Sequence, residues 1–154
     1  MTEEQLRHAF DEFNSRHFDG ALSCDVVLTK DWMDDGGNYY AESIVESAGD
    51  GFLTGIANGV KVQRATALYT HSKNLIRIPR WKTVGRSAAG VLLHEMAHSA
   101  ANEPEVEHGP KWHAEMKRLL KQGAPINLQD VTPGHTDHEL VDKYGVGSAF
   151  WESL

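Results

Sequence analysis

The hydrophobic pattern at the start of the chain predicts an amphipathic helix over residues 2–17. Apolar and aromatic side chains recur there at three- and four-residue spacing, which places them on one stripe of a helix: Leu6, Ala9, Phe10, Phe13 and His17. Thr2 and Gln5 have the spacing of a capping box, in which each side chain accepts a hydrogen bond from the other residue's backbone N–H. The helix is expected to end at Phe18-Asp19-Gly20.

Strand patterns follow this helix, separated by a segment rich in turn residues. Strands are predicted over residues 25–29, 60–69 and 74–78, the last of them ended by Pro79. Residues 31–59 contain six glycines and six acidic residues, with no Lys or Arg. Such a composition disfavours a helix and predicts hairpins and loops.

Two further helices are predicted in the second half of the chain. The first begins after Thr83 or Ser87, either of which can cap it, and ends near residue 101. Its core side carries five apolar residues: Ala89, Leu92, Leu93, Met96 and Ala100. The second helix opens at Gly109-Pro110 and ends near residue 122, before Gly123.

The order of these elements predicts a single α+β domain. We assign its core to residues 1–122 and a turn-rich C-terminal tail to residues 123–154. The 154 residues, 40% of them hydrophobic, suit one globular domain. The apolar runs are too short to cross a bilayer, and the acidic start lacks the pattern of a secretory signal. With Cys24 as the single cysteine, a disulfide within the chain is excluded, so we expect a cytoplasmic protein without a membrane partner.

Charge is unevenly distributed along the chain. The net charge of −7 argues against a protein held on nucleic acid by its overall field. However, the segment from Lys61 to Arg86 contains no acidic residue and seven basic ones, together with Trp81. Bases of single-stranded or damaged DNA could stack on this tryptophan while phosphates meet the cations. The alternative is a solvated face that balances acidic residues elsewhere.

The sequence His94-Glu95-Met96-Ala97-His98 is an H-E-x-x-H motif within a predicted helix. Residues four apart lie one turn above each other, so both imidazoles can hold one metal ion while Glu95 lies beside it. Zinc in such a site lowers the pKa of a bound water to about 7, and Glu95 would take its proton as the water attacks a carbonyl. Two plain surface histidines are the alternative, since the chain has nine.

A catalytic zinc ion needs a third protein ligand and an open fourth position. His108 stands at the start of the next predicted helix, ten residues after His98, and a turn between them could bring it over the site. The rival ligands are His113 and three carboxylates: Glu103, Glu105 and Glu107.

The two-part motif resembles that of the SprT-like metallopeptidases, which include the Spartan proteases. That family has H-E-[LM]-x-H followed by H-G-x-x-[FW] and a Met shortly after, matched here from His94 to His98 and by His108, Gly109, Trp112 and Met116. The likeness extends more loosely over residues 4–122, through Phe13-Asn14, Phe18-Asp19-Gly20 and the strand at residues 74–78.

This resemblance implies a zincin-like domain, with a small mixed or antiparallel sheet packed on the H-E-x-x-H helix and its flanking helices. It implies one catalytic Zn²⁺ held by His94, His98 and His108, with Glu95 as general base in a metalloendopeptidase acting on proteins or peptides. DNA-associated proteins are one substrate class in the family, although a Cys₄ zinc ribbon is excluded here. The alternatives are a repressor-cleaving zinc peptidase without DNA dependence and a non-catalytic binding module.

Weaker signals concern substrate binding and the tail. In a zincin, the strand at residues 74–78 would be an edge strand that binds extended substrate, although a plain core strand is equally consistent. The candidates for stabilising the oxyanion are Tyr69, His71 and Tyr144. The tail offers a second histidine pair and an aromatic segment that could pack over the cleft: His135, His138, Phe150 and Trp151.

Overall fold

The computed structural model describes residues 1–49, 51–83 and 88–126. Its helices are α1 (Glu3–His17), α2 (Ala88–Ala101) and α3 (Pro110–Lys121), with short 3₁₀ turns η1 (Glu42–Ile44), η2 (His71–Lys73) and η3 (Arg80–Thr83). Its strands are β1 (Asp25–Thr29), β2 (Trp32–Met33), β3 (Tyr39–Tyr40), β4 (Val45–Ser47), β5 (Thr54–Ala57), β6 (Val60–Arg64), β7 (Leu68–Thr70) and β8 (Leu75–Pro79). The α+β class predicted from the sequence is confirmed.

The predicted first helix is present as α1, with the expected cap. Thr2 and Gln5 exchange hydrogen bonds between side chain and backbone N–H at 2.8 and 3.2 Å. The predicted stripe faces the core, where Leu6 and Phe10 are buried. At the other end of the chain, α3 also follows its prediction: Gly109 is the N-cap residue and Gly123 has a φ of +74° just after the helix.

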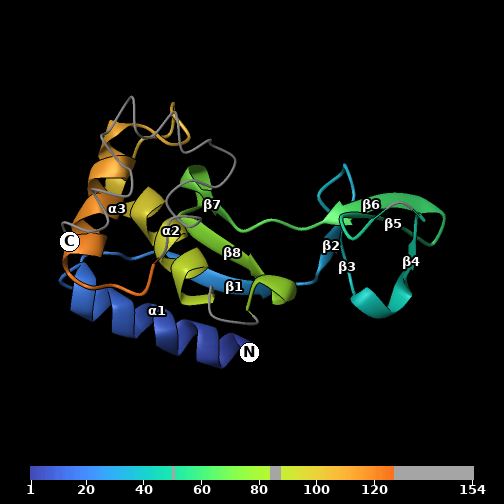
Figure 1. Ribbon diagram of the computed structural model, residues 1–154, viewed down its shortest axis with the longest axis horizontal. Coiled ribbons are helices and arrows are strands. Elements are labelled where there is room, and N and C mark those ends of the chain that lie inside the picture. Colours follow the sequence, from blue (N-terminus) through green and yellow to red (C-terminus); the bar gives the residue numbers. More distant parts are fainter. Residues whose placement is uncertain (50, 84–87, 127–154) are drawn as a thin grey trace.

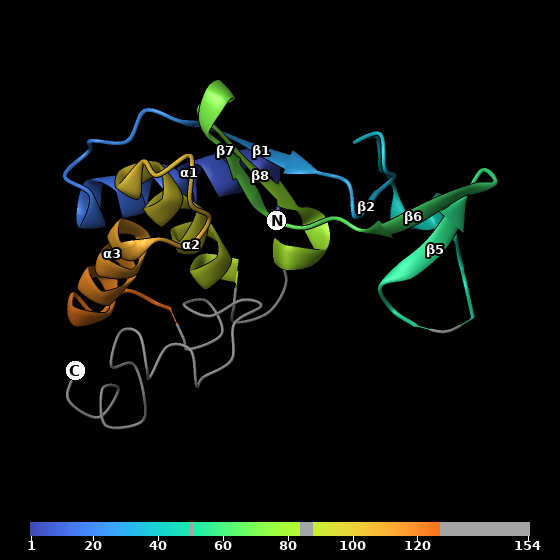
Figure 2. The same cartoon turned by 90° about the horizontal axis from the view of Figure 1, so that it is seen from above.

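Two sheets organise the described residues. The first is a mixed sheet of order β1-β8-β7, in which β1 and β8 are parallel while β7 and β8 are antiparallel. The second is an antiparallel sheet of order β3-β2-β6-β5-β4. Figure 1 shows the first sheet beside the helices and the second sheet set apart from them, joined by the links from β1 to β2 and from β6 to β7. Figure 2 shows the same separation from above.

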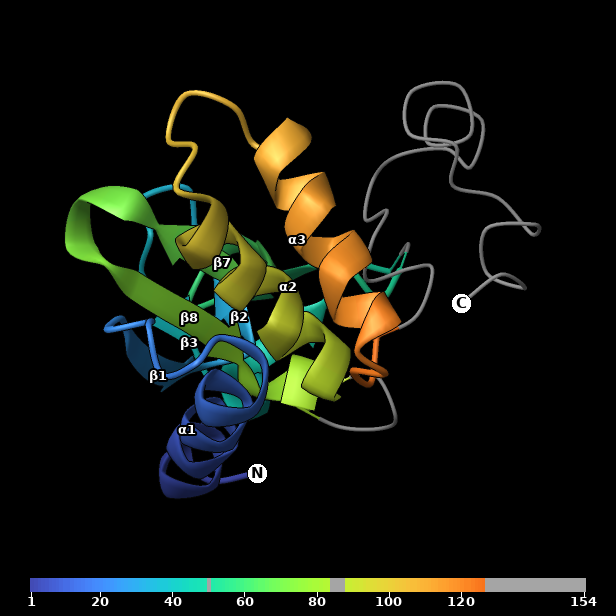
Figure 3. The same cartoon turned by 90° about the vertical axis from the view of Figure 1, so that its left-hand side faces the viewer.

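One hydrophobic core joins the three helices to the first sheet. Its fully buried members come from the three helices and from strands β1 and β8: Leu6, Val26, Ile76, Ile78, Leu92, Leu93, Met96, Trp112, Met116 and Leu119. Figure 3 shows α2 between the sheet and α3. Because α2 contacts the strands β7 and β8 on one side and α3 on the other, it lies at the centre of this half of the molecule. No helix within the described ranges is long and apolar enough to cross a membrane.

Two strand predictions need correction. The strand expected over residues 60–69 is two strands, β6 and β7, which belong to different sheets. The chain passes between the sheets at Ala65, which is fully buried and donates its N–H to the Asp31 carbonyl at 2.8 Å. The strand expected at an edge, over residues 74–78, is instead the central strand β8, paired with β1 on one side and β7 on the other. The strand of this sheet beside the candidate site is therefore β7.

Residues 31–49 and 51–59 form hairpins, loops and one 3₁₀ turn, as the composition of this segment predicts. The link between β5 and β6 shows why: Asn58 and Gly59 have φ values of +52° and +79°, the left-handed pair that a two-residue hairpin turn requires. Thr83 and Ser87 are the two candidates predicted to cap α2 at its N-terminus. Thr83 ends η3 and donates its hydroxyl to the Arg80 carbonyl at 2.6 Å, while Ser87 lies outside the described residues.

Candidate metal centre

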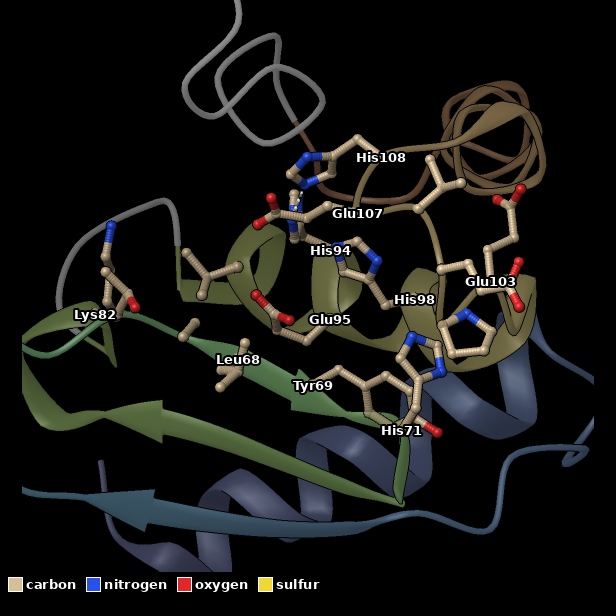
Figure 4. Close-up of a pocket in the computed structure, with 16 residues that line it drawn as sticks. Leu68, Tyr69, His71, Lys82, His94, Glu95, His98, Glu103, Glu107 and His108 are labelled. Carbon is tan, nitrogen blue, oxygen red and sulfur yellow. Dashed lines mark hydrogen bonds between the residues drawn. The ribbon is translucent and has the colours of Figure 1, made fainter. Parts of the chain in front are cut away.

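The H-E-x-x-H motif lies near the middle of α2, with its polar side chains directed into a pocket. His94 and Glu95 are 7% and 5% exposed, and the rings of His94 and His98 are 5.0 Å apart. The four-residue spacing aligns these rings along the helix, as predicted. Figure 4 shows both imidazoles and the Glu95 carboxylate in the same pocket.

A tight turn after α2 returns the chain to the site and delivers His108. Asn102 adopts a left-handed conformation with φ +50°, and its N–H donates to the His98 carbonyl at 3.1 Å, which ends the helix. The Nε2 atom of His108 lies 3.2 Å from Nε2 of His94. One ring nitrogen from each of His94, His98 and His108 lies within 4.8 Å of the others.

This triangle of nitrogens suits a zinc ion. Tetrahedral zinc bonds to histidine nitrogens at about 2.0–2.1 Å, which places them about 3.4 Å apart. The separation of 3.2 Å between His94 and His108 is close to that value. Three imidazoles with an open fourth side also form the ligand set of catalytic rather than closed structural zinc sites.

The rival third ligands have other contacts. His113 lies one turn into α3, and its Nδ1 atom is 3.0 Å from the Gly109 carbonyl. The Glu103 carboxylate accepts a hydrogen bond from the backbone N–H of Trp112 at 2.9 Å. Glu105 and Glu107 line the pocket, but among the described residues the group close enough to hold a metal ion consists of the three histidines. The structure therefore favours His108 among the candidates that the sequence left open.

Trp112 forms the floor of the histidine cluster, a role that the sequence alone does not reveal. The indole ring is fully buried and lies 4.7, 5.4 and 4.5 Å from the rings of His94, His98 and His108, centre to centre. Its N–H donates to the His94 carbonyl at 3.3 Å. The tryptophan thus fixes α3 against α2 and limits the positions that all three imidazoles can take.

Glu103 and Gly109 explain how the turn holds its shape. The Glu103 carboxylate accepts a backbone N–H from the first turn of α3, which satisfies a donor that the helix leaves unpaired. A Cβ atom at Gly109 would lie 2.6 Å from the Glu103 carboxylate oxygen. Glycine is therefore needed before α3 because the capping carboxylate occupies the space of a side chain.

We expect Gly109→Ala to lower the free energy of unfolding by about 1 kcal/mol, the usual cost of losing a helix cap. The added methyl group displaces Glu103 from the Trp112 N–H. Urea denaturation of the variant measures the loss, and the double variant Gly109→Ala/Glu103→Ala is the control. Because Glu103→Ala removes both the cap and the clash, the two losses should be clearly less than additive. Full additivity would contradict this contact.

Burial controls the acidity of Glu95. The pKa of Glu95 is raised from 4.5 to about 8, mainly because burial removes the carboxylate from water. A hydrogen bond from the Tyr69 backbone N–H lowers the pKa, nearby Glu107 raises it and Lys82 lowers it. The Tyr69 N–H donates to the Glu95 carboxylate. This bond holds the carboxylate against the outer edge of β7, facing the pocket.

The histidine cluster favours neutral imidazole rings. Burial, together with the neighbouring His94, His108 and His71, lowers the pKa of His98 from 6.5 to about 3. Metal ions bind the neutral ring, so an imidazole that resists protonation is a suitable ligand.

In the metal-free protein, we expect Glu95→Gln to raise thermal stability, and to raise it more at pH 8 than at pH 6. The folded chain holds the Glu95 proton up to a pKa of about 8, whereas the unfolded chain releases it near 4.5. Folding therefore becomes less favourable as pH rises from 4.5 to 8, and glutamine removes this loss. Unfolding temperatures of both proteins in EDTA provide the measurement. A difference between them that does not change with pH would contradict the buried, protonated state.

The pocket in front of the histidines has a volume of about 730 Å³. Its walls are β7 and the preceding link, α2, the turn between α2 and α3, and Lys82 of η3 (Figure 4). Both apolar and charged side chains line it: Leu68, Val91 and Val106 are apolar, and Lys82, Glu105 and Glu107 are charged. It is large enough to receive a peptide segment beside the histidines.

Two of the three oxyanion candidates lie at this pocket. The Tyr69 hydroxyl donates to the Asn74 side chain at 2.9 Å, which already uses its proton. His71 lines the pocket, and its ring packs edge to face against the Tyr69 ring with the two ring centres 4.7 Å apart. The Nδ1 atom of His71 is buried without a hydrogen-bond partner among the described residues. Tyr144 lies outside the described residues, as do His135, His138, Phe150 and Trp151.

The basic segment does not present a uniform surface. Arg64 forms an ion pair with Glu42, and Arg77 donates to the Thr70 hydroxyl at 2.9 Å. Trp81, the expected stacking platform, donates its indole N–H to the Ala65 carbonyl at 2.6 Å and has Lys82 over its ring at 4.4 Å. The residues that could face a nucleic acid are thus partly engaged within the protein.

Comparisons with family models, with curated proteins and with solved structures find no match for this chain. The interpretation of the site therefore rests on its own residues and geometry.

Proposed function

We propose that this protein is a zinc-dependent endopeptidase of the SprT-like kind. The observation that carries the proposal is the convergence of three imidazole nitrogens beside a buried glutamate in one pocket. The motif that these residues form resembles that of the SprT-like metallopeptidases and supports the same conclusion. His94, His98 and His108 would hold the zinc ion, and Glu95 would be the general base.

The chemistry follows from the position of each side chain. Bound zinc supplies Lewis acidity, which activates water and polarises a carbonyl group. Glu95 lies beside the ligand His94, where its carboxylate can take a proton from the attacking water and pass it to the leaving amine. Its high pKa without metal suits a group that must carry a proton for part of the cycle. Among the described candidates, His71 is the better placed to donate to the oxyanion.

Substrate would lie along β7, the edge strand of the first sheet. An extended peptide can bind there by adding a further strand, with the β7 backbone supplying hydrogen bonds and the pocket walls receiving side chains. Glu95 holds the Tyr69 N–H at the same edge, so a peptide on β7 would pass the general base. This geometry favours unfolded or flexible protein segments as substrates.

The test is cleavage of reduced, carboxymethylated α-lactalbumin, which stays unfolded, by zinc-loaded wild type and by Glu95→Gln. Cleavage by the wild type but not by Glu95→Gln supports the proposal. Wild-type protein that binds zinc but cleaves nothing favours the binding-module alternative. Adding single-stranded DNA separates the remaining two: stimulation favours a peptidase of DNA-associated proteins, and no effect favours a peptidase with one protein target.

A further inference from the structure

Two large apolar side chains are exposed to solvent beside the second sheet, where Phe52 contacts Trp81 of η3. Phe52 and Leu53 are 61% and 60% exposed, more than any other large hydrophobic residue described. They precede β5, whose other end carries the turn to β6. Contiguous exposed apolar patches, especially those rimmed by polar residues, mark interaction sites on protein surfaces.

The segment that carries them is fixed by Arg64. The Arg64 backbone N–H donates to the Leu53 carbonyl at 3.0 Å, and its Nε atom donates to the Phe52 carbonyl at 3.2 Å. The guanidinium lies between the rings of Trp32 and Phe52, 4.2 Å from the centre of each, and pairs with Glu42. Exposure of the two side chains is therefore part of the folded structure rather than a result of loose packing.

This surface continues into the candidate active-site pocket. The Phe52 ring meets Trp81 edge to face at 5.8 Å, and Lys82, the next residue, lines the pocket. Lys82 also lies over the Trp81 ring. We call Phe52, Leu53 and Trp81 the Phe52 patch. Trp81 directly precedes Lys82 of the pocket wall, and Figure 2 shows η3 on the side of the first sheet that faces the second sheet.

We propose that the Phe52 patch is a secondary substrate-binding site that receives a large apolar side chain of an unfolded protein, outside the cleft. The inference rests on the proposed peptidase function for the meaning of the cleft. In this proposal, an extended chain that leaves the pocket past Lys82 would meet the patch, a contact that a peptide too short to pass Lys82 would lack. The protein would thus prefer proteins with exposed apolar segments.

Charge and size favour this occupant over two others. Arg64 is paired with Glu42, and Lys82 over the Trp81 ring is the other cation among the described residues that contacts the patch. A single-stranded nucleic acid is held by a groove of cations that follows its backbone, which this apolar patch does not offer. Three side chains are also too few for a stable interface between two copies of the chain, which buries about 1,200 Å² or more. A single apolar side chain of a passing polypeptide is the occupant that fits.

The test compares Leu53→Ser and Phe52→Ser with Val60→Ser, an equally polar change at an exposed residue on the opposite end of the β5–β6 hairpin. Leu53→Ser leaves the Arg64 stack intact, because that stack uses Phe52. Two substrates are used: carboxymethylated α-lactalbumin and a six-residue peptide, which extends only about 10 Å to either side of its scissile bond. We expect the two patch variants to lower kcat/KM for the protein by about fivefold through KM, with no effect on the peptide.

Binding of labelled α-lactalbumin in the Glu95→Gln background, followed by fluorescence anisotropy, decides the matter even if the wild type cleaves nothing. A Kd raised about fivefold by Leu53→Ser and Phe52→Ser, but not by Val60→Ser, supports the patch. An unchanged Kd in the two patch variants, or an equal change in Val60→Ser, overturns it. The proposal is also overturned if the patch variants bind single-stranded DNA more weakly but bind α-lactalbumin as the wild type does. It is likewise overturned if the wild type is a dimer that Phe52→Ser dissociates. Absence of cleavage with patch-dependent binding would instead refute the peptidase function alone.

Discussion

Glu95→Gln is expected to reduce kcat/KM for protein cleavage by about 1,000-fold, within the range of 10²–10⁴ typical of general acid–base catalysis. Glutamine has nearly the same shape as glutamate, and its amide oxygen can still accept the Tyr69 N–H. It cannot take a proton from water at neutral pH. Since Glu95 is not among the three ligand residues, zinc content should stay unchanged. The measurement is steady-state cleavage with metal analysis of the same preparations.

Glu105→Gln is the matched control, because it removes another glutamate of the same pocket. Its kcat/KM should stay within about threefold of the wild type, as for an exposed charge without a contact to the reacting atoms. If Glu95→Gln cleaved as fast as the control, Glu95 would not be the base. Loss of zinc together with activity would show that the variant had damaged the metal centre instead.

His108→Ala is expected to lower zinc affinity by more than 100-fold. Loss of a partner that only orients a ligand already costs about 10–100-fold, and removal of a ligand should exceed this. Wild-type protein, purified without a metal-binding tag, should contain close to one zinc ion per chain, and the variant should contain much less. Mass spectrometry of the metal content and titration with a competing zinc chelator give the two values.

His113→Ala serves as the comparison, since His113 was a rival third ligand on the next turn of α3. It should keep its zinc, because its Nδ1 atom faces the Gly109 carbonyl and it lies outside the ligand cluster. A wild type that takes up no zinc even when zinc is offered would refute the metal centre altogether. Equal zinc loss in both histidine variants would indicate unfolding of α3 rather than removal of a ligand.

Features governed by neighbours along the chain could be predicted from the sequence. The two residues of the α1 capping box are three positions apart, and the two histidines of the α2 motif are four positions apart, so spacing alone determines which side chains meet. The turn that returns His108 to the site was also predictable in outline. The sequence could not choose among His108, His113 and the three glutamates, because that choice depends on the path of the turn after Asn102.

Features that depend on distant pairing could not be predicted. Nothing in residues 60–69 shows that the chain changes sheets at Ala65, because both halves carry a strand pattern. The central position of β8 follows from its parallel pairing with β1, some 50 residues earlier in the sequence. The sequence does draw attention to Trp112, because it is the aromatic residue of the H-G-x-x-[FW] motif. Its contact with all three histidines depends on how α3 packs against α2.

The contact between Asp31 and Ala65 also has a consequence for how the chain folds. Parallel pairing of Thr29 with Pro79 closes a long loop, and the entropy of closure grows with loop length. Three of the four pairings described for the second sheet join strands that follow one another in the chain, and the fourth, between β2 and β6, brings Asp31 and Ala65 together across their 2.8 Å hydrogen bond. We expect this sheet to form first. The remaining loop is then about 15 residues instead of about 50, which lowers the entropic cost of closure by about 1 kcal/mol. The second sheet would thus hasten formation of the sheet that supports the histidines.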